Sequence, residues 1–538
     1  MFFVISGFLI TGILSREISE RRFSLSDFYE RRARRILPAL FVVLLATIAG
    51  GWLVLPPDPF RELAQSVLAT VFFVSNFWFW QSTGDYFGTD AEWQPLLHTW
   101  SLSVEEQFYL GFPLLLAFLL VRGRRAMLIG VLGLSLLSFG ISIWATTAQP
   151  LANYFLTPSR IWELGLGALI ALGLMPPASR PAGQPALAGG AGGCDGVGHD
   201  SCSVVFYDAS TPFPGVAALL PCVGAAALIW AGGQHSTLTG RLLAWRPFVA
   251  VGLISYSLYL WHWPVLVLFR LLHGGTELPM VLAFQGIFVS LLLAWVSWRF
   301  VEAPFRRPEP VGFSRIMVVR ACAGLATVII TLALVINVNK GLPSRLPEDL
   351  YATYRNAIER TPEQRRCMGR SPSEGLCEFG GRVSESAGAD YLLWGDSHAG
   401  AFLPGYQQWL EANGHRGLAA VKSACAPVMG VVRREMGPEH GCDIFNAQVI
   451  EMLEDREDIG TVILVARWPL VVEGSRSPGE SGPPVVMGFA GAKEQSLSGA
   501  DLDVAQHNAE LVARGWPRQW PEFVRQGGKY SLWTVFPK

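Results

Sequence analysis

Long apolar segments fill the first 338 residues and constrain the fold more than any other feature. A transmembrane helix needs about 20 apolar residues, and several of these segments reach that length, while the others are shorter. They lie near 36–55, 64–80, 104–121, 126–146, 161–175, 214–231, 247–270, 279–300 and 316–338. We therefore predict a polytopic α-helical membrane domain over residues 1–338.

Charged residues are unevenly distributed along the chain. Only 16% of all residues are charged, 51% are hydrophobic and the mean hydropathy is +0.34. Of 42 basic and 43 acidic residues, 21 and 18 precede Asn339, which leaves about 23% charged residues in the remainder, near the norm for soluble domains. This pattern excludes a disordered chain or a single soluble domain. It predicts a linker and domain start at 339–388 and a second domain at 389–538.

Four basic loops predict the orientation, because Lys and Arg concentrate in cytoplasmic loops. They are Arg16 to Arg35, Arg122 to Arg125, Arg241/Arg246 and Arg299 to Arg320. All four loops lie in the cytoplasm if two conditions hold. The polar-containing segment 64–80 must be interfacial or re-entrant, and the weak apolar segment 186–206 must cross the membrane. Residues 339–538 then lie outside the cytoplasm. The net charge of −1 gives no argument for a nucleic-acid partner.

The chain begins with an apolar run that ends near Arg16. This run is short for a span and lacks the basic start and small-residue cleavage site of a signal peptide. We expect that the chain starts partway through a transmembrane helix.

Two polar stretches in the membrane domain are candidates for function. The first, Arg31-Arg32-Ala33-Arg34-Arg35, has guanidinium groups suited to phosphates, although it could equally be a topology-setting basic loop. The second runs from His98 to Tyr109 and contains Glu105 and Glu106. Ionisable groups in a membrane helix are costly and usually functional. Interfacial groups solvated by lipid headgroups are the alternative.

Further polar groups are scattered through later apolar segments. Arg160 and Glu163 are three residues apart and can pair on one helix face. His262 lies between two tryptophans, a pattern that also fits an interfacial aromatic belt. From these residues alone, a transporter and a membrane enzyme both remain open.

Residues 339–538, which we call the outer domain, contain four cysteines. An even number of cysteines in an extracytoplasmic domain suggests disulfides. Closeness in sequence favours Cys367–Cys377 and Cys425–Cys442. Four unpaired buried thiols are the alternative. A zinc site is disfavoured because no CxxC spacing occurs, so we predict no metal.

The outer domain also contains a strand–turn–helix pattern. A buried strand is expected at 389–394, followed by Gly395-Asp396-Ser397-His398 and a helix through Leu410. A serine at such a turn suits a nucleophile, because helix N-terminal amides can stabilise an oxyanion. An ordinary N-cap turn is the alternative. Apolar runs at 417–421, 460–466 and 531–536 alternate with helical stretches at 443–455 and 504–514, which predicts an α/β sandwich with a parallel sheet.

Six stretches together resemble the membrane acyltransferase-3 family, which includes bacterial O-acetylases of O-antigen and other surface polysaccharides. They are Phe2 to Thr11, Arg31 to Pro38, His98 to Tyr109, Arg160 to Gly165, Ser255 to Pro264 and Phe300 to Arg306. The resemblance implies a multi-pass protein of the bacterial inner membrane. It implies an acyl-CoA donor, acetyl-CoA being the expected one, and an acceptor hydroxyl on a surface or exported glycan.

The same resemblance implies roles for individual residues. Arg32 and Arg35 match a donor-binding Arg-x-x-Arg pair, and His98 and Glu105 would have acid/base or orienting roles. Family members also have an earlier helix with a membrane histidine and an acidic residue just before the Phe-Phe-Val-Ile-Ser stretch. This chain has neither, so we expect that its N-terminus is truncated.

Residues 389–538 resemble the SGNH hydrolase-like domain that is fused to such acyltransferases. Ser397 matches the nucleophile, with Asp396 beside it in the predicted catalytic site. The expected Asp-x-x-His base does not follow Ser397, and Arg467 stands where an oxyanion-hole Gly-x-Asn would be sought. We therefore expect a C-terminal truncation as well, and an inactive fragment is one possible consequence.

The leading hypothesis is an O-acyltransferase that passes an acyl group across the membrane to a glycan. Its partners would be the lipid bilayer and the glycan acceptor, with no bound cofactor. A membrane-tethered carbohydrate esterase and a secondary transporter with an accessory domain are the alternatives. Internal repeats would favour the transporter, and none is evident in the sequence.

Overall fold

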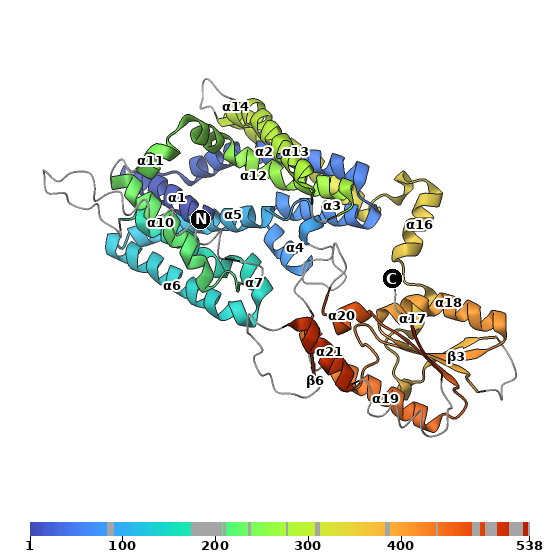
Figure 1. Ribbon diagram of the computed structural model, residues 1–538. Coiled ribbons are helices and arrows are strands. Elements are labelled where there is room, and N and C mark those ends of the chain that lie inside the picture. Colours follow the sequence, from blue (N-terminus) through green and yellow to red (C-terminus); the bar gives the residue numbers. More distant parts are fainter. Residues whose placement is uncertain are drawn as a thin grey trace. The chain divides into compact units, whose positions relative to one another are not determined.

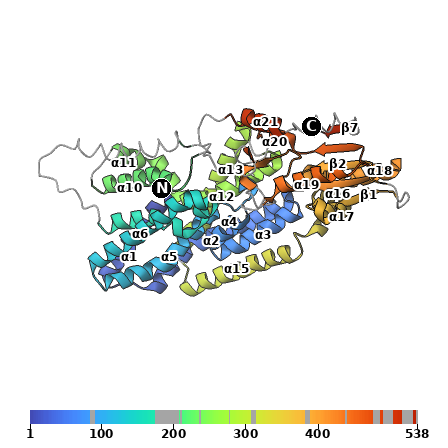
Figure 2. The ribbon, with the colours of Figure 1, turned by 90° about the horizontal axis from the view of Figure 1, so that it is seen from below.

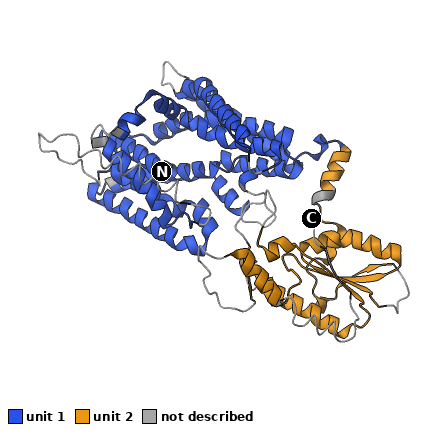
Figure 3. Cartoon of the chain, viewed as in Figure 1, with its two compact units in different colours: residues 1–347 blue, residues 348–538 orange. Residues whose placement is uncertain are grey.

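The chain forms two compact units, Met1–Pro347 and Glu348–Lys538, which are coloured separately in Figure 3. The computed structural model describes residues 1–82, 91–173, 207, 211–234, 238–275, 278–306, 313–381, 388–436, 440–475, 485–489, 503–515 and 531–535. The weak apolar segment 186–206 lies outside these residues.

The first unit consists of helices (Figure 1). They are α1 (Phe2–Ser19), α2 (Leu25–Val54), α3 (Pro57–Val71), α4 (Ser75–Ser82), α5 (Thr99–Leu120), α6 (Arg124–Ala148), α7 (Pro150–Phe155), α8 (Ile161–Ala171), α10 (Leu219–Gln234), α11 (Leu238–Leu243), α12 (Arg246–His273), α13 (Met280–Ser297), the π-helical turn η5 (Trp298–Glu302), α14 (Ala303–Arg306) and α15 (Arg315–Val338). Short 3-10 turns lie at Ala91–Trp93, Thr157–Ser159, Val216–Ala218 and Pro343–Arg345.

Seven helical segments of the described chain are long and apolar enough to span a membrane. They are Phe2–Ser19, Leu25–Val54, Thr99–Leu119, Arg124–Ala148, Arg246–His273, Met280–Arg306 and Arg315–Val338. The prediction of a polytopic helical membrane domain is therefore confirmed. Two predicted segments, 161–175 and 214–231, instead form the shorter apolar helices α8 and α10.

The polar-containing segment 64–80 is not one continuous helix. α3 ends at Val71 and α4 begins at Ser75, and Phe73 between them has a φ of 53°. Neither helix approaches the length of a span. Buried hydroxyl and amide groups have partners here, with Ser75 Oγ 2.7 Å from Ser103 Oγ on α5. These bonds explain how polar side chains are accommodated inside an apolar unit.

Glycines allow α1 and α8 to pack in direct backbone contact. A Cβ at Gly7 would lie 1.9 Å from the carbonyl oxygen of Leu164, and one at Gly167 would lie 1.9 Å from that of Val4. Only glycine fits at such distances, and small residues at helix interfaces commonly permit close packing in membranes. Ser6, directly before Gly7, is partly buried and reaches Glu105 and Tyr109 on α5. α15 packs along α3, and Figure 2 shows the two helices together.

The second unit contains a five-stranded sheet with the order β1-β3-β2-β5-β7. Its strands are β1 (Cys377–Gly380), β2 (Tyr391–Gly395), β3 (Arg416–Val421), β5 (Thr461–Val465) and β7 (Ser531–Val535). The last four are parallel, as predicted, and edge strand β1 is antiparallel to β3, so the sheet is mixed. A separate two-stranded pair consists of β4 (Val431–Arg433) and β6 (Met487–Phe489).

Helices cover both faces of the five-stranded sheet and make it the middle layer of a three-layer sandwich. The helices of this unit are α16 (Glu348–Ile358), α17 (Pro362–Cys367), α18 (Ser397–Asn413), α19 (Cys442–Asp455), α20 (Trp468–Val472) and α21 (Val504–Gly515), with 3-10 turns at Pro372–Glu374 and Arg434–Met436. Alternate strand residues point to opposite faces. Leu393 packs against α18 on one face, whereas Trp394 packs in the core that includes α19 on the other. The predicted fold class is confirmed.

The Asp458 side chain stabilises the segment that leads into β2. Asp458 accepts hydrogen bonds from the Ala389 amide at 2.6 Å and from the Arg456 guanidinium at 2.6 Å. The hydrogen bond from Arg456 is the main cause that lowers the pKa of Asp458 to about 2. Because the folded pKa lies below the unfolded value of about 3.9, this contribution is present above pH 4 and is lost as pH falls towards 2.

We expect Asp458→Asn to destabilise the second unit near neutral pH, with a smaller difference from wild type as pH falls from about 4 to about 2. Urea unfolding of the full chain in detergent, followed by tryptophan fluorescence, measures this difference. Asp455→Asn, at the exposed end of α19, is the matched control. A difference that persists unchanged to pH 2 would contradict the ionic origin of the effect.

Candidate functional site

A buried polar cluster joins α1, α2 and α5 in the membrane unit. The Arg32 guanidinium lies 2.8 Å from a carboxylate oxygen of Glu106, 4.0 Å from one of Glu105 and 3.8 Å from the centre of the Tyr109 ring. Glu105 also accepts hydrogen bonds from the hydroxyls of Ser6 and Tyr109. Side-chain exposure is only 16% for Arg32 and 6% for Glu105. The cluster therefore holds one guanidinium and two carboxylates inside an apolar helical unit.

The predicted Arg-x-x-Arg pair lies in the first turns of α2, not in a loop. Arg32 points to the buried carboxylates, whereas Arg35 is exposed and lies within electrostatic range of Glu105 and Glu106. The neighbouring arginines have other partners, with Arg31 bound to Glu17 and Arg34 bound to Glu30. Arg31 and Arg35 are both exposed, but Arg31 pairs with Glu17, whereas Arg35 lies within electrostatic range of the buried carboxylates.

His98 lies at the N-terminal end of α5, in a second cluster. Its ring centre is 5.1 Å from that of Tyr259 and 5.5 Å from that of His262, both on α12. The Tyr259 hydroxyl donates to the His98 carbonyl at 2.6 Å and lies 3.0 Å from Ser101 Oγ. His98 and Glu105, which the sequence placed two turns apart on one helix, thus have separate sets of neighbours.

Two further ion pairs lie in the membrane unit, one fully buried and one between buried Glu302 and exposed Arg306. Arg160 pairs with Glu163, as their spacing predicted, and both side chains are almost fully buried. Glu302 accepts from Ser257 Oγ at 2.9 Å and from Arg306 at 2.9 Å. Neither set shares a residue with the Arg32 cluster, so we assign these pairs a structural role.

In the second unit, Ser397 is the first residue of α18, directly after the C-terminal end of β2. Asp396 is the N-cap and accepts hydrogen bonds from the His398 amide at 2.8 Å and the Arg467 amide at 2.9 Å. A Cβ at Gly395 would lie 1.7 Å from the Val465 carbonyl oxygen, so the turn requires glycine. The predicted strand–turn–helix is present, and Asp396 ties it to the end of β5.

The histidines that follow Ser397 do not form a hydrogen bond with its hydroxyl within the described part of the chain. Each has another polar neighbour: His398 lies near the Asp396 carboxylate, His415 near the Asp390 carboxylate, His440 near the Ser423 carbonyl and His507 near the Met487 carbonyl. The described residues therefore provide a partly exposed serine at a helix N-terminus, without a histidine positioned on it.

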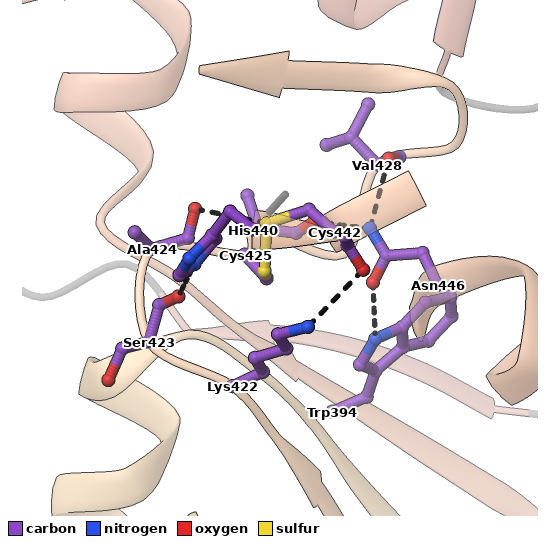
Figure 4. Close-up of a disulfide and its surroundings, with 11 residues drawn as sticks. Trp394, Lys422, Ser423, Ala424, Cys425, Val428, His440, Cys442 and Asn446 are labelled. Carbon is purple, nitrogen blue, oxygen red and sulfur yellow. Dashed lines mark hydrogen bonds between the residues drawn. A yellow bond between two sulfur atoms is a disulfide. The ribbon is translucent and has the colours of Figure 1, made fainter. Parts of the chain in front are cut away.

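Both predicted disulfides, Cys367–Cys377 and Cys425–Cys442, are present. The second links the loop after β3 to the start of α19, with His440 beside it (Figure 4). The sulfur atoms of Cys425 and Cys442 and a ring nitrogen of His440 lie within 4.8 Å of one another. Because the disulfide uses both sulfurs, only the imidazole remains as a ligand, and we assign no metal site there.

These features define a multi-pass membrane protein joined to an α/β unit that presents a serine at a strand–helix turn. Residues 1–299 match the acyltransferase domain family Acyl_transf_3, and the chain belongs to this family. Residues 363–512 match the SGNH domain that is fused to such domains. No solved structure matches the chain.

Relatives are found in Staphylococcus aureus. The O-acetyltransferase OatA of strain NCTC 8325 / PS 47 is 31% identical over 325 residues, which are 57% of this chain and 52% of OatA. A second relative, SACOL0978 of strain COL, is 29% identical over 398 residues, 71% of this chain and 65% of its own length. Its name marks the assignment as an O-acetyltransferase as provisional. The chain thus spans about half the length of the OatA relatives that it matches.

Proposed function

We propose that this protein is a membrane O-acetyltransferase that transfers an acetyl group from cytoplasmic acetyl-CoA to a sugar hydroxyl of a surface or exported glycan. The observation that carries this proposal is the buried Arg32–Glu106 ion pair within the acyltransferase domain. Charged groups inside a membrane unit usually mark a substrate or ion pathway. The printed names of the relatives support acetyl as the transferred group.

The donor would bind beside the first turns of α2. Guanidinium groups bind phosphates with bidentate, charge-assisted hydrogen bonds, and CoA carries several phosphates. Exposed Arg35 would make the first contact, and Arg32 would lie further inside next to Glu105 and Glu106. The accumulation of arginines at this end of α2 supports a cytoplasmic location through the positive-inside rule.

The second unit would act on the opposite side of the membrane. Two disulfides favour an oxidising, extracytoplasmic compartment. Ser397 would take part in delivering the acetyl group to the glycan, because its hydroxyl lies at the N-terminus of α18, where backbone amides can stabilise a developing oxyanion. Direct transfer without a covalent intermediate on Ser397 is the other route to the same product.

A membrane-tethered esterase is the second candidate function, and the placement of Ser397 favours it. An SGNH-like domain with a nucleophilic serine could remove acetyl groups instead of delivering them. The two activities differ in the fate of the acyl group. A transferase moves it from the thioester to a glycan ester, whereas an esterase releases free acetate.

Membrane vesicles that contain the full chain can distinguish these activities. We expect radiolabelled acetyl-CoA to give alkali-labile label in the glycan fraction only when it reaches the cytoplasmic face, as in inside-out vesicles. Vesicles without the chain are the control. Release of acetate from an acetylated glycan or from 4-nitrophenyl acetate, with no incorporation from acetyl-CoA, would contradict the transferase and support the esterase.

A further inference from the structure

His262 occupies an unusual position for a residue of an aromatic belt. It lies in the interior of α12 (Arg246–His273), one of the helices long enough to span the membrane, and not near either end. Its ring centre is 5.5 Å from that of His98, and the two rings meet edge to face. Two histidines from distant parts of the chain therefore lie together inside the membrane unit.

Hydrogen bonds determine which nitrogen of His262 carries the proton. Nδ1 lies 2.8 Å from the Tyr259 carbonyl oxygen and 3.1 Å from the Leu258 carbonyl oxygen. Carbonyl oxygens only accept hydrogen bonds, so Nδ1 must be the protonated nitrogen. In a neutral ring, Nε2 is then left with its lone pair as a proton acceptor. The helix thus holds the imidazole in one tautomer and one orientation.

His98 is held in place at the start of α5. Its carbonyl accepts a hydrogen bond from the Tyr259 hydroxyl, and its buried ring packs against the rings of Tyr259 and His262, close to the backbone of Leu260. The pair thus combines a fixed proton acceptor with a second, buried imidazole.

An apolar cavity lies against the same stretch of α12 that contains His262. It has a volume of about 160 Å³ and is bounded by α2, α12 and α13; its lining includes Trp261, Pro264 and Pro95, but neither of the two imidazoles. The lining is almost entirely apolar. A cavity of this size can hold a small apolar group, which would then lie against the residues that flank His262 in sequence.

We propose that His262 is the proton acceptor for acyl transfer within the membrane unit, with His98 as the second imidazole of the same site. The proposal rests on the acyltransferase function proposed above. The acceptor hydroxyl would give its proton to His262 Nε2 while its oxygen forms a bond to the thioester carbonyl carbon. The carbon–sulfur bond then breaks, and the leaving thiolate takes the proton from the imidazolium, so the products are an ester and a free thiol.

The deciding variant is His262→Gln, assayed in the full chain with acetyl-CoA and membrane vesicles. Glutamine is polar and of similar size, but it is not a base. General-base catalysis contributes about 10²–10⁴-fold, so we expect the maximal rate to fall at least about 100-fold, with KM for acetyl-CoA unchanged. His273→Gln, at the exposed end of the same helix, is the matched control and should leave the rate unchanged.

His262→Ala provides a second measurement that a purely structural role would not affect in the same way. Added imidazole should restore part of the rate, because it can supply the missing base in the space left by the side chain. Wild-type turnover in His262→Gln, or a folded alanine variant that imidazole does not restore, would overturn the proposal. If the wild-type chain itself transfers no acetyl group, the proposed function fails, and this inference fails with it.

Discussion

Replacing Arg32 with glutamine should abolish acyl transfer and destabilise the membrane unit. The guanidinium is the cation that faces both Glu105 and Glu106, and all three side chains are mostly buried. Removing one partner of a buried ion pair typically costs about 3–5 kcal/mol, because the remaining charge is left uncompensated. Thermal unfolding of the purified chain and acetyl incorporation from acetyl-CoA measure the two effects separately.

A double variant distinguishes a donor-binding role from a structural one. Arg32→Gln with Glu106→Gln removes both members of the closest pair, so the cluster regains its wild-type net charge and most of the lost stability should return. If Arg32 binds the donor, transfer remains lost. Recovery of transfer together with stability would show that Arg32 acts only as a counter-ion. Arg22→Gln, in an exposed pair with Glu20, should change stability by less than about 1 kcal/mol.

Hydropathy predicted the helices of the membrane unit better than their ends. Residues 16–35 were expected to form a basic loop, but α2 already begins at Leu25, where the Ser24 hydroxyl accepts from the Asp27 amide. Hydropathy detects the part of a helix that fits lipid, whereas capping groups determine where the helix starts. The interruption between α3 and α4 is likewise a local backbone feature, which apolar composition does not encode.

Contacts between site residues were predicted best where the residues are close in sequence. The disulfides join residues only 10 and 17 positions apart, and the turn at Ser397 is a local motif. The membrane clusters instead join residues that are far apart in sequence, such as Arg32 and Glu106, 74 positions apart, and His98 and Tyr259, 161 positions apart. One sequence shows that such residues are polar, but only packing shows which of them meet. Ser6 and His262 were therefore present in recognised stretches without assigned partners.

The second unit shows the same limit in a different form. The parallel strands follow from alternating apolar runs and helices, and all four were predicted close to their observed positions. Edge strand β1 and the β4–β6 pair were missed, because strands of three or four residues contain too little pattern to recognise. Neither changes the position of Ser397, which depends on β2, β5 and α18.

Replacing Ser397 with alanine should lower transfer to the glycan about a thousandfold if the acyl group passes through a covalent ester on this serine. The physical reason is the loss of the one hydroxyl that the fold presents at the N-terminus of α18, beside amides already oriented by the Asp396 cap. Folding should be unaffected, because the hydroxyl makes no hydrogen bond within the described residues. Ser373→Ala, at an exposed position of the same unit, is the matched control.

The same variant separates the two routes and the two candidate functions. In a covalent route, label from acetyl-CoA should appear on the wild-type protein as an alkali-labile ester and be absent from Ser397→Ala. Full transfer by the alanine variant would contradict the covalent route and leave direct attack of the sugar hydroxyl. If Ser397→Ala removes hydrolysis of 4-nitrophenyl acetate while acetyl-CoA never labels the glycan, the serine serves an esterase. The fate of the acyl group, and not the presence of the serine, then decides which reaction this turn supports.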